Sequence, residues 1–405
     1  MRVLYIFPTL LALLLFNACK KHKENKIEPD REYVKYVNTT SVLTDLVTLD
    51  MVRTSDNGYL ILGSSPSLTK SYHTIYLLKI DKEGNYLWDG YLPETYINPI
   101  SEIIIKDGAY YLFCMDVTAG THLIRFSDQA LKTESVKYFE EILLPLHASP
   151  TPDGGYLVLN ANLSDKWSGI TKIASDFKIS WSEQYYFNEN FAAEIDRHLK
   201  REGLPLSFAT GSLQNGSAFY FNSFSDANFS TVFVNPLNGK ADGFNIIGGD
   251  RAYAAIKTIL SLGEDKFAIS RYDRNGNTFL IPNASIAIKS STFIASTELG
   301  GIKLPDMEVN TRIQCRRINL SGKEVIIYCA NTKNKGIGLY AFDVSTGAFL
   351  GSKAYNLETP LELGVFSFSS DGGILILGKT YIANRFPRVC IFKIDPEQAG
   401  KIAGF

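Results

Sequence analysis

Short apolar runs, each bounded by Gly, Asp or Asn, recur along nearly the whole chain. The run "GYLILG" begins at Gly58, "GYLVLN" at Gly155 and "ILILGK" at Ile374. Runs rich in β-branched and aromatic residues between turn-forming residues predict β-strands. Several runs are apolar without alternation, which is typical of strands covered on both faces. The pattern therefore predicts an all-β protein whose sheets are stacked between other sheets.

Two turn signals repeat in step along the chain. The first marks seven units about 50 residues apart, at Asp56, Asp107, Asp153, Asn215, Glu264, Ser321 and Asp371. The second follows 20 to 25 residues later, at Asp81, Asp128, Asp176, Asn235, Asp343 and Asp395, and only the fifth unit lacks it. A four-stranded unit repeated seven times predicts a seven-bladed β-propeller over residues 32–405, because stacked blades bury each other's faces.

The two ends of this region are expected to share one blade. The last unit has strands near 365–370, 374–379 and 388–394 but no clear outer strand. The segment "REYVKYVNTT", which begins at Arg31, precedes the first unit and stands where an outer strand is missing. Pairing the two segments would close the ring and cover an open sheet edge.

The repeats resemble a known pattern, "DGGYLILG…LLKIDxxGNxxW", found in propeller domains of Bacteroidota secreted proteins and lipoproteins. The stretch from Asp56 to Trp88 matches this pattern best, and the other units match it partly or only in spacing. Trp88 and Trp181 occupy equivalent places, which predicts packing between blades. The resemblance implies the propeller fold and no particular activity.

The N-terminus resembles a bacterial lipoprotein signal peptide over residues 1–18. Arg2 is followed by an apolar run from Val3 to Phe16 and then by Cys19. Phe16 stands where Leu is usual, and an ordinary secretory signal is the alternative. The resemblance implies a lipid attached to Cys19.

Residues 19–31 are polar and lack apolar periodicity, so we expect a flexible tether. The chain is therefore expected in the bacterial cell envelope, anchored to a membrane through its lipid and most simply to the outer membrane. Lys20 and Lys21 after the Cys favour the periplasmic side. Oligomeric state and the choice of membrane side stay open.

Charge and residue content exclude several classes of function. Lys and Arg number 41 against 42 Asp and Glu, a net charge of −1, so no basic excess points to nucleic acid. The five His and five Cys show no metal-ligand spacing, and neither a metal nor a cofactor is predicted. Cys315 and Cys329 flank an expected hairpin at Gly322, which leaves a disulfide or buried free thiols as alternatives.

Acidic residues near the innermost strands do not align at one offset from the turns. They are Asp45, Glu102, Glu141, Glu308 and Glu362. This spread favours solvated strand ends over a ring of carboxylates, although a pair brought together could perform acid–base chemistry.

The strongest departure from the repeat is an insert after Trp181. Apolar residues recur there every four positions, so a helix over about 190–202 is predicted, with Asn190 as its cap and Gly203 at its end. The insert is either a plug on the propeller rim or a partner-binding site. Its candidate binding residues are Phe191, Ile195, Leu199, Arg197, Lys200 and Arg201.

The leading functional hypothesis is a non-enzymatic lipoprotein that binds or scaffolds an envelope protein or a glycan. It predicts no close pair of shielded carboxylates or histidines with strongly shifted pKa values. One alternative is a glycan-active hydrolase or lyase with its site over the propeller channel, which requires polar residues converging from several innermost strands. Another is a factor in outer-membrane assembly. The fold by itself selects none of them.

Overall fold

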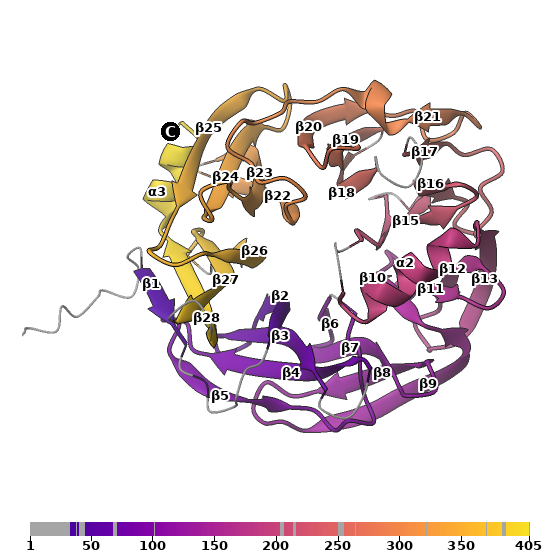
Figure 1. Ribbon diagram of the computed structural model, residues 1–405, viewed down its shortest axis with the longest axis horizontal. Coiled ribbons are helices and arrows are strands. Elements are labelled where there is room, and N and C mark those ends of the chain that lie inside the picture. Colours follow the sequence, from indigo (N-terminus) through magenta and orange to yellow (C-terminus); the bar gives the residue numbers. More distant parts are fainter. Residues whose placement is uncertain are drawn as a thin grey trace, which may run out of the picture. The chain divides into compact units, whose positions relative to one another are not determined.

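Seven β-sheets stand around a central channel in the computed structural model (Figure 1). The predicted signal peptide, Cys19 and the predicted tether lie outside the described residues. The residues described are 33–37, 39, 45–67, 71–100, 102–202, 206–213, 216–249, 255–263, 265–320, 322–369, 371–382 and 386–404. The predicted seven-bladed propeller is confirmed.

Each blade runs outward from an innermost strand at the channel. Blade 1 comprises β2 (Val47–Arg53), β3 (Tyr59–Pro66), β4 (His73–Ile80) and β5 (Tyr86–Tyr91). Blade 2 comprises β6 (Ile104–Lys106), β7 (Ala109–Met115), β8 (Gly120–Phe126) and β9 (Thr133–Leu143). Blade 3 comprises β10 (Pro145–Pro150), β11 (Tyr156–Asn162), β12 (Trp167–Ile173) and β13 (Ile179–Tyr186).

The remaining four blades continue around the ring. Blade 4 comprises β14 (Ala209–Ser212), β15 (Phe219–Ser225), β16 (Asn228–Val234) and β17 (Ile246–Gly248), and blade 5 β18 (Ile256–Gly263), β19 (Lys266–Tyr272) and β20 (Thr278–Ser285). Blade 6 comprises β22 (Ile313–Leu320), β23 (Lys323–Asn331), β24 (Ile337–Asp343) and β25 (Phe349–Tyr355). Blade 7 comprises β26 (Glu362–Phe368), β27 (Ile374–Ile382), β28 (Phe386–Ile394) and β1 (Tyr33–Tyr36).

The apolar runs form the middle strands, and their side chains fill the spaces between blades. All eight residues of β4 are buried. Leu60 and Leu62 of blade 1 share one apolar cluster with Leu112 and Ile124 of blade 2. Apolar surface on both faces of these strands is removed from water, which is why the sequence does not alternate.

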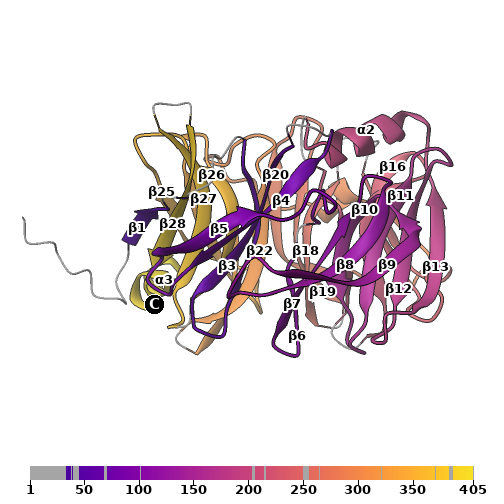
Figure 2. The ribbon, with the colours of Figure 1, turned by 90° about the horizontal axis from the view of Figure 1, so that it is seen from below.

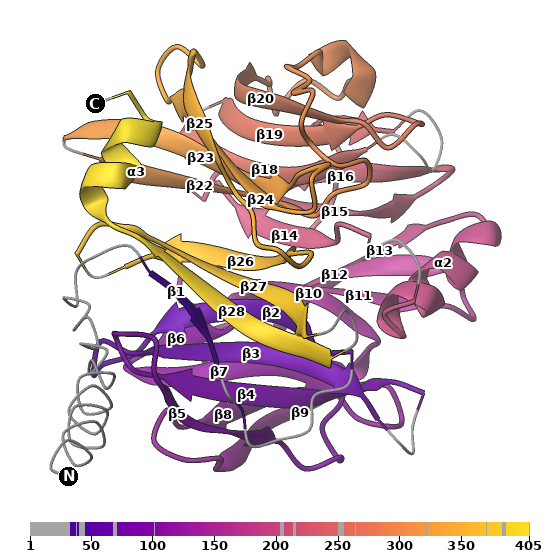
Figure 3. The same cartoon turned by 60° about the vertical axis from the view of Figure 1, so that its left-hand side comes forward.

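The ring closes as predicted, through one blade built from both ends of the chain. Strand β1 pairs antiparallel with β28, with Tyr33 opposite Lys393 and Tyr36 opposite Cys390 (Figure 3). A short helix that the sequence reading missed, α3 (Pro396–Ile402), follows β28. Asp395 caps it by accepting a 2.8 Å hydrogen bond from the Gln398 amide.

Blade 5 departs from the four-stranded plan. Its sheet has three strands, and the next segment, β21 (Phe293–Ala295), pairs in parallel with β17 at the outer edge of blade 4. A 3₁₀ turn, η2 (Ser296–Leu299), follows. Because the chain leaves blade 5 after β20, this unit does not need the second turn signal, and the sequence lacks it.

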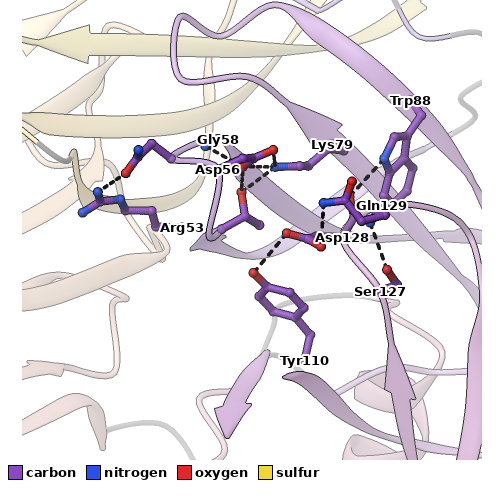
Figure 4. A network of polar contacts seen from close by, with 11 residues as sticks. Arg53, Asp56, Gly58, Lys79, Trp88, Tyr110, Ser127, Asp128 and Gln129 are labelled. Carbon is purple, nitrogen blue, oxygen red and sulfur yellow. Dashed lines mark hydrogen bonds and ion pairs between the residues drawn. The ribbon is translucent and has the colours of Figure 1, made fainter. Parts of the chain in front are cut away.

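A buried lysine explains why a short motif of Thr or Ser, Asp and Gly recurs at the first turn of several blades. Lys79 of β4 has a side chain that is 1% exposed, and its ammonium group donates to both carboxylate oxygens of Asp56, at 2.7 and 2.9 Å (Figure 4). It also donates to the Thr54 hydroxyl. The Gly58 amide donates to the same carboxylate at 2.9 Å. We call this arrangement of Thr, Asp, Gly and Lys the lysine clasp.

The lysine clasp is also present in the two other blades that carry this motif. Lys172 pairs with Asp153 at 2.7 Å in blade 3, and Lys393 pairs with Asp371 in blade 7. Glycine is needed because a Cβ at Gly155 would clash with the Ile173 carbonyl. The recurring motif is therefore polar and pairs a buried cation. The strand residues around it fill the core.

The predicted packing of Trp88 and Trp181 between blades is confirmed. The indole of Trp88 donates to the Asp128 carbonyl of blade 2 at 3.3 Å, and that of Trp181 to the Pro236 carbonyl of blade 4 at 3.0 Å. Each ring thus joins the outer strand of its own blade to a turn of the next.

The alternatives for Cys315 and Cys329 are resolved by strand register. Cys315 lies opposite Tyr328, and Cys329 opposite Gln314, so the two cysteines are one residue out of register and face opposite sides of the sheet. Both are free thiols.

Candidate ligand pocket

A cavity of about 550 Å³ opens at one mouth of the central channel. All seven blades contribute to its wall, each through the start of its innermost strand or the segment before it. The end of α2 (Asn190–Leu199) and the residues after it complete the wall. Figure 2 shows α2 at this end of the propeller. The volume is that of a small-molecule site.

Backbone irregularities direct side chains into this pocket. Register shifts interrupt four innermost strands near the pocket, between Thr48 and Asp50, Pro145 and His147, Ile256 and Thr258, and Leu363 and Val365. A β-bulge re-aims the side chains around it and is common near functional sites. Lys257 is itself the extra residue of its bulge, while Asp50 and His147 directly follow theirs.

Three cations of the pocket wall are held by neutral backbone carbonyls. Arg312 donates to the Thr48 carbonyl at 2.8 Å, Arg201 to the Pro99 carbonyl at 2.7 Å, and Lys257 to the Thr311 carbonyl at 2.8 Å. Within the part of the chain that the structure describes, none of the three forms an ion pair.

The pKa values of these cations reflect the missing negative charge. Burial, with the nearby charge of Arg312, lowers the pKa of Arg201 to about 10. Burial lowers the pKa of Lys257 to about 8. Both groups are therefore held in a setting that disfavours their charged form, as expected for cations that lack an anion.

Two carboxyl groups face the cations. Burial raises the pKa of Asp50 to about 6, and the charge of Glu102 adds to this effect, although Asp50 Oδ2 accepts a 2.7 Å hydrogen bond from the Ile103 amide. The protein around the cavity raises the pKa of Glu102 to about 7, while Arg316 opposes the shift. The Glu102 side chain projects into the pocket and stays 42% exposed, so water there moderates the effect.

A histidine from the next blade approaches Glu102. The Thr210 amide donates to Nδ1 of His147 at 3.1 Å, which places the proton of the neutral ring on Nε2. Nε2 lies 3.7 Å from Glu102 Oε1. Burial lowers the pKa of His147 to about 4, so the neutral form dominates. The Thr210 hydroxyl donates to Ser149 at 2.9 Å, which extends the chain of contacts.

Two buried polar atoms of the wall have no hydrogen-bond partner among the residues that the structure describes. They are Nε of Arg201, a donor, and Oδ1 of Asn98, an acceptor. Buried polar atoms are nearly always hydrogen-bonded, so unpaired ones at a pocket wall mark positions where a ligand or water can bind.

The predicted helix of the insert is confirmed, and it buries its apolar face. Phe191, Ile195 and Leu199 pack into a core cluster, where Phe191 stacks on Phe224 at 4.3 Å between ring centroids. The buried three are therefore closed to a partner in this conformation. Asn190 is the first helical residue rather than the cap, and Gly203 lies outside the described residues.

The charged residues of the insert divide between two places. Arg197 pairs with Glu194, and Lys200 with Asp196 at 2.6 Å, along the helix surface. Arg201 instead lines the pocket. The insert thus packs its helix against the propeller and places the cation of Arg201 at the pocket wall.

The expectation of scattered, solvated acids is wrong for Glu102, which lines the pocket together with Asp50 and His147. The expectation of no close pair with shifted pKa values is also wrong, because Glu102 and His147 lie 3.7 Å apart and both pKa values are shifted, although Glu102 is not shielded from water. Glu362 lines the pocket too, but it pairs with Lys379 at 2.8 Å. Asp45, Glu141 and Glu308 are not among the lining residues.

A looser alignment would have found much of this site. A polar residue stands five to seven positions before the turn signal in each of the first six units. These residues are Asp50, Glu102, His147, Thr210, Lys257 and Gln314. The one-residue bulges vary the offset, so a search at a single fixed spacing misses the set.

No group of His, Cys, Asp and Glu among the described residues is arranged to hold a metal ion. Within the same part of the chain, no helix has the length and apolar content needed to cross a membrane.

No family model and no curated protein matches the chain. Similar solved structures include a protein from Bacteroides fragilis provisionally assigned as a 6-phosphogluconolactonase, at 13% identity, with a TM-score of 0.47 over 85% of this chain and 95% of that one. The β-propeller domain of the Trilobed protease from Pyrococcus furiosus matches at 8% identity, with a TM-score of 0.45 over 88% and 97% of the two chains. Likenesses this distant carry no argument about function. Fold and pocket together define a seven-bladed β-propeller with a charged pocket at one mouth of its channel.

Proposed function

We propose that this protein is a cell-envelope lipoprotein, anchored through Cys19, whose central pocket binds an anionic ligand such as an acidic glycan. One observation carries the proposal. Arg201, Arg312 and Lys257 line the pocket, and each is held by a backbone carbonyl without an ion-pair partner among the described residues. Cations prepared in this way favour a negatively charged ligand.

The charge balance of the pocket supports this choice. Four cations, Arg201, Arg312, Arg316 and Lys257, face two carboxyl groups, because Glu362 and Lys379 neutralise each other. The carboxyls have raised pKa values, which lessens the negative charge that they carry near neutral pH. Each hydrogen bond between a charged group and the ligand would contribute about 1.5–3 kcal/mol.

The second candidate is a protein partner that docks on the insert. The outer surface of α2 supports it, because Arg197 keeps a half-exposed side chain (53%) and Lys200 a partly exposed one (30%). Both are already in ion pairs along the helix, which leaves less to gain from a partner than in the pocket. We therefore favour the pocket.

Calorimetric titration of the lipidated full-length protein in detergent would test the proposal. The probes are oligosaccharides of polygalacturonate, alginate and hyaluronate, with uncharged dextran oligosaccharides as controls. We expect binding of at least one acidic probe, weakening with salt, and a loss of at least tenfold in affinity for Arg312→Gln and Lys257→Met. The matched control is Lys178→Met, an exposed lysine paired with Asp176.

Equal binding of dextran, or unchanged affinity in both pocket variants, would refute the proposal. Thermal melting of each variant separates loss of binding from loss of folding. A ligand that binds equally well to Arg312→Gln but is lost on Arg197→Glu would move the site to the helix surface.

A further inference from the structure

We propose that the same pocket is catalytic, and that Asp50 and Glu102 act as an acid–base pair that cleaves an acidic glycan by β-elimination. The inference rests on the proposed function, because the cations must first hold the carboxylate of the sugar. It adds a reaction and assigns it to two side chains from adjacent blades.

Geometry supports the pair before any consideration of pKa. The Ile103 amide fixes the Asp50 carboxyl at 2.7 Å, and Glu102 is the neighbouring residue in the chain. Glu102 extends into the cavity with 42% of its side chain exposed. The Nε2–H group of His147 lies 3.7 Å from its carboxylate. An accessible carboxyl oriented by a second group is the usual arrangement of a general acid or base.

Structural carboxylates elsewhere in this protein behave in the opposite way. In the clasps, partial burial is outweighed by the hydrogen bonds from Lys79 and Lys172, and the pKa values of Asp56 and Asp153 fall to about 2. Among the described residues, neither Asp50 nor Glu102 accepts a hydrogen bond from a lysine, although four cations line the same pocket. Groups whose pKa values lie close to the working pH, grouped in a cleft, are typical of catalysis.

The cations select the reaction. In a hexuronate, the hydrogen on C5 is acidic only when the charge of the C6 carboxylate is neutralised. Arg312, Arg201 and Lys257 supply that neutralisation and also stabilise the negative charge that develops on the carboxylate oxygens. Hydrolysis of a glycosidic bond has no such need for surplus cations.

The step balances without a co-reactant. The ionised carboxyl of the pair removes the C5 proton, the C5–H electrons form the C4=C5 bond, and the C4–O4 bond breaks. The protonated carboxyl gives its proton to O4, which leaves as a hydroxyl on the departing chain. The pair then holds one proton as before, now on the other carboxyl, and transfer between them restores the starting state. Asp50 and Glu102 line the same pocket, and the charge of Glu102 adds to the raised pKa of Asp50, so the two groups interact as this exchange requires.

His147 is a positioning residue in this scheme. Its Nδ1 is occupied by the Thr210 amide, so its Nε2–H can only donate toward Glu102. We expect His147→Gln, which keeps a donor in the side chain, to retain activity better than His147→Ala and to shift the pH profile of kcat less.

The test uses the full-length protein and the acidic oligosaccharide that binds in the titration above. Elimination creates a C4=C5 bond conjugated with the carboxylate, which absorbs in the ultraviolet, whereas hydrolysis releases reducing ends without that absorbance. We expect the wild type to generate absorbance and reducing ends in equal amounts. Glu102→Gln and Asp50→Asn should each lose at least 100-fold in kcat and keep binding within a few fold. Glu141→Gln, an exposed glutamate of β9, is the matched control.

The outcomes separate the two proposals. A probe that binds with no product, or that yields reducing ends without absorbance, would overturn the elimination and leave the binding function standing. Absorbance that persists in both carboxyl variants would remove Asp50 and Glu102 from the mechanism. If no acidic probe binds, both proposals fail together.

Discussion

The lysine clasp of blade 1 allows a quantitative test of what the sequence repeat contributes to the fold. We compare Asp56→Asn, Lys79→Met and the double variant. In Asp56→Asn the ammonium group of Lys79 stays buried, 1% exposed, and keeps the Thr54 hydroxyl but loses its anion. In the double variant the buried charge is gone as well. The double variant should therefore be more stable than the sum of the two single losses predicts.

The size of the expected stability change follows from the pKa of Asp56. Partial burial raises the pKa of Asp56, but hydrogen bonds from Lys79, the Thr54 hydroxyl and the Gly58 amide outweigh it and together lower the pKa from 3.8 to about 2. At 1.36 kcal/mol per pKa unit this shift corresponds to about 2 kcal/mol. Because the Asp56 side chain is 45% exposed, we reduce the figure by roughly half, to about 1 kcal/mol. The unpaired Lys79 adds to this, so we expect Asp56→Asn to cost about 2 kcal/mol and the coupling energy to reach about 1 kcal/mol.

Urea unfolding followed by tryptophan fluorescence measures these quantities. The pKa shift of Asp56 also determines the direction in which its contribution to stability changes with pH. The pKa of Asp56 is lower in the folded state than in the unfolded chain, so its contribution is complete above about pH 4 and is lost as pH falls toward 2. Wild type and Asp56→Asn should therefore converge in acid. Coupling below about 0.3 kcal/mol at pH 7, or a difference that persists unchanged at pH 2, would refute the reasoning.

Three further expectations concern the pocket, the blade contacts and the thiols. Burial raises the pKa of Asp50 above its unfolded value, so this group lowers the free energy of unfolding as pH rises from about 4 to 6; Asp50→Asn should be the more stable protein at pH 8 in urea titrations, and equal pH slopes would contradict this. Trp88→Phe removes the hydrogen bond to the Asp128 carbonyl and should cost about 1 kcal/mol in the same assay, whereas an unchanged midpoint would show that this bond does not stabilise the blade contact. Cys315 and Cys329 should both react with a thiol reagent in the unfolded protein without prior reduction, and a mass of two fewer hydrogens would reveal the disulfide that the register excludes.

Blade number, strand positions and ring closure were predictable because they depend on local chemistry repeated in order. A turn needs Gly, Asn or Asp at defined places, and a strand between two sheets needs apolar residues on both faces. The exchange of β21 into the sheet of blade 4 was not predictable. The sequence shows only that the fifth unit lacks a turn, and the new partner of that segment is a matter of three-dimensional packing.

The insert shows the same division on a smaller scale. Four-residue spacing of Phe191, Ile195 and Leu199 predicted a helix, and a helix is present. The spacing cannot say whether the apolar face meets the propeller or a partner. Stacking of Phe191 on Phe224, a residue of β15, answers that question.

The sequence alone therefore determined the scaffold: seven repeated sheets, the helix and the shared closing blade, all of which follow from local periodicity and turn chemistry. Only the tertiary structure decided the site. Asp50, Glu102, His147, Arg201, Lys257 and Arg312 belong to six different segments of the chain. They meet because closing a ring brings the starts of all innermost strands to one mouth, and bulges adjoin Asp50, His147 and Lys257 there. Burial and neighbouring charge exist only after that closure, and they set the pKa values on which the proposed chemistry depends.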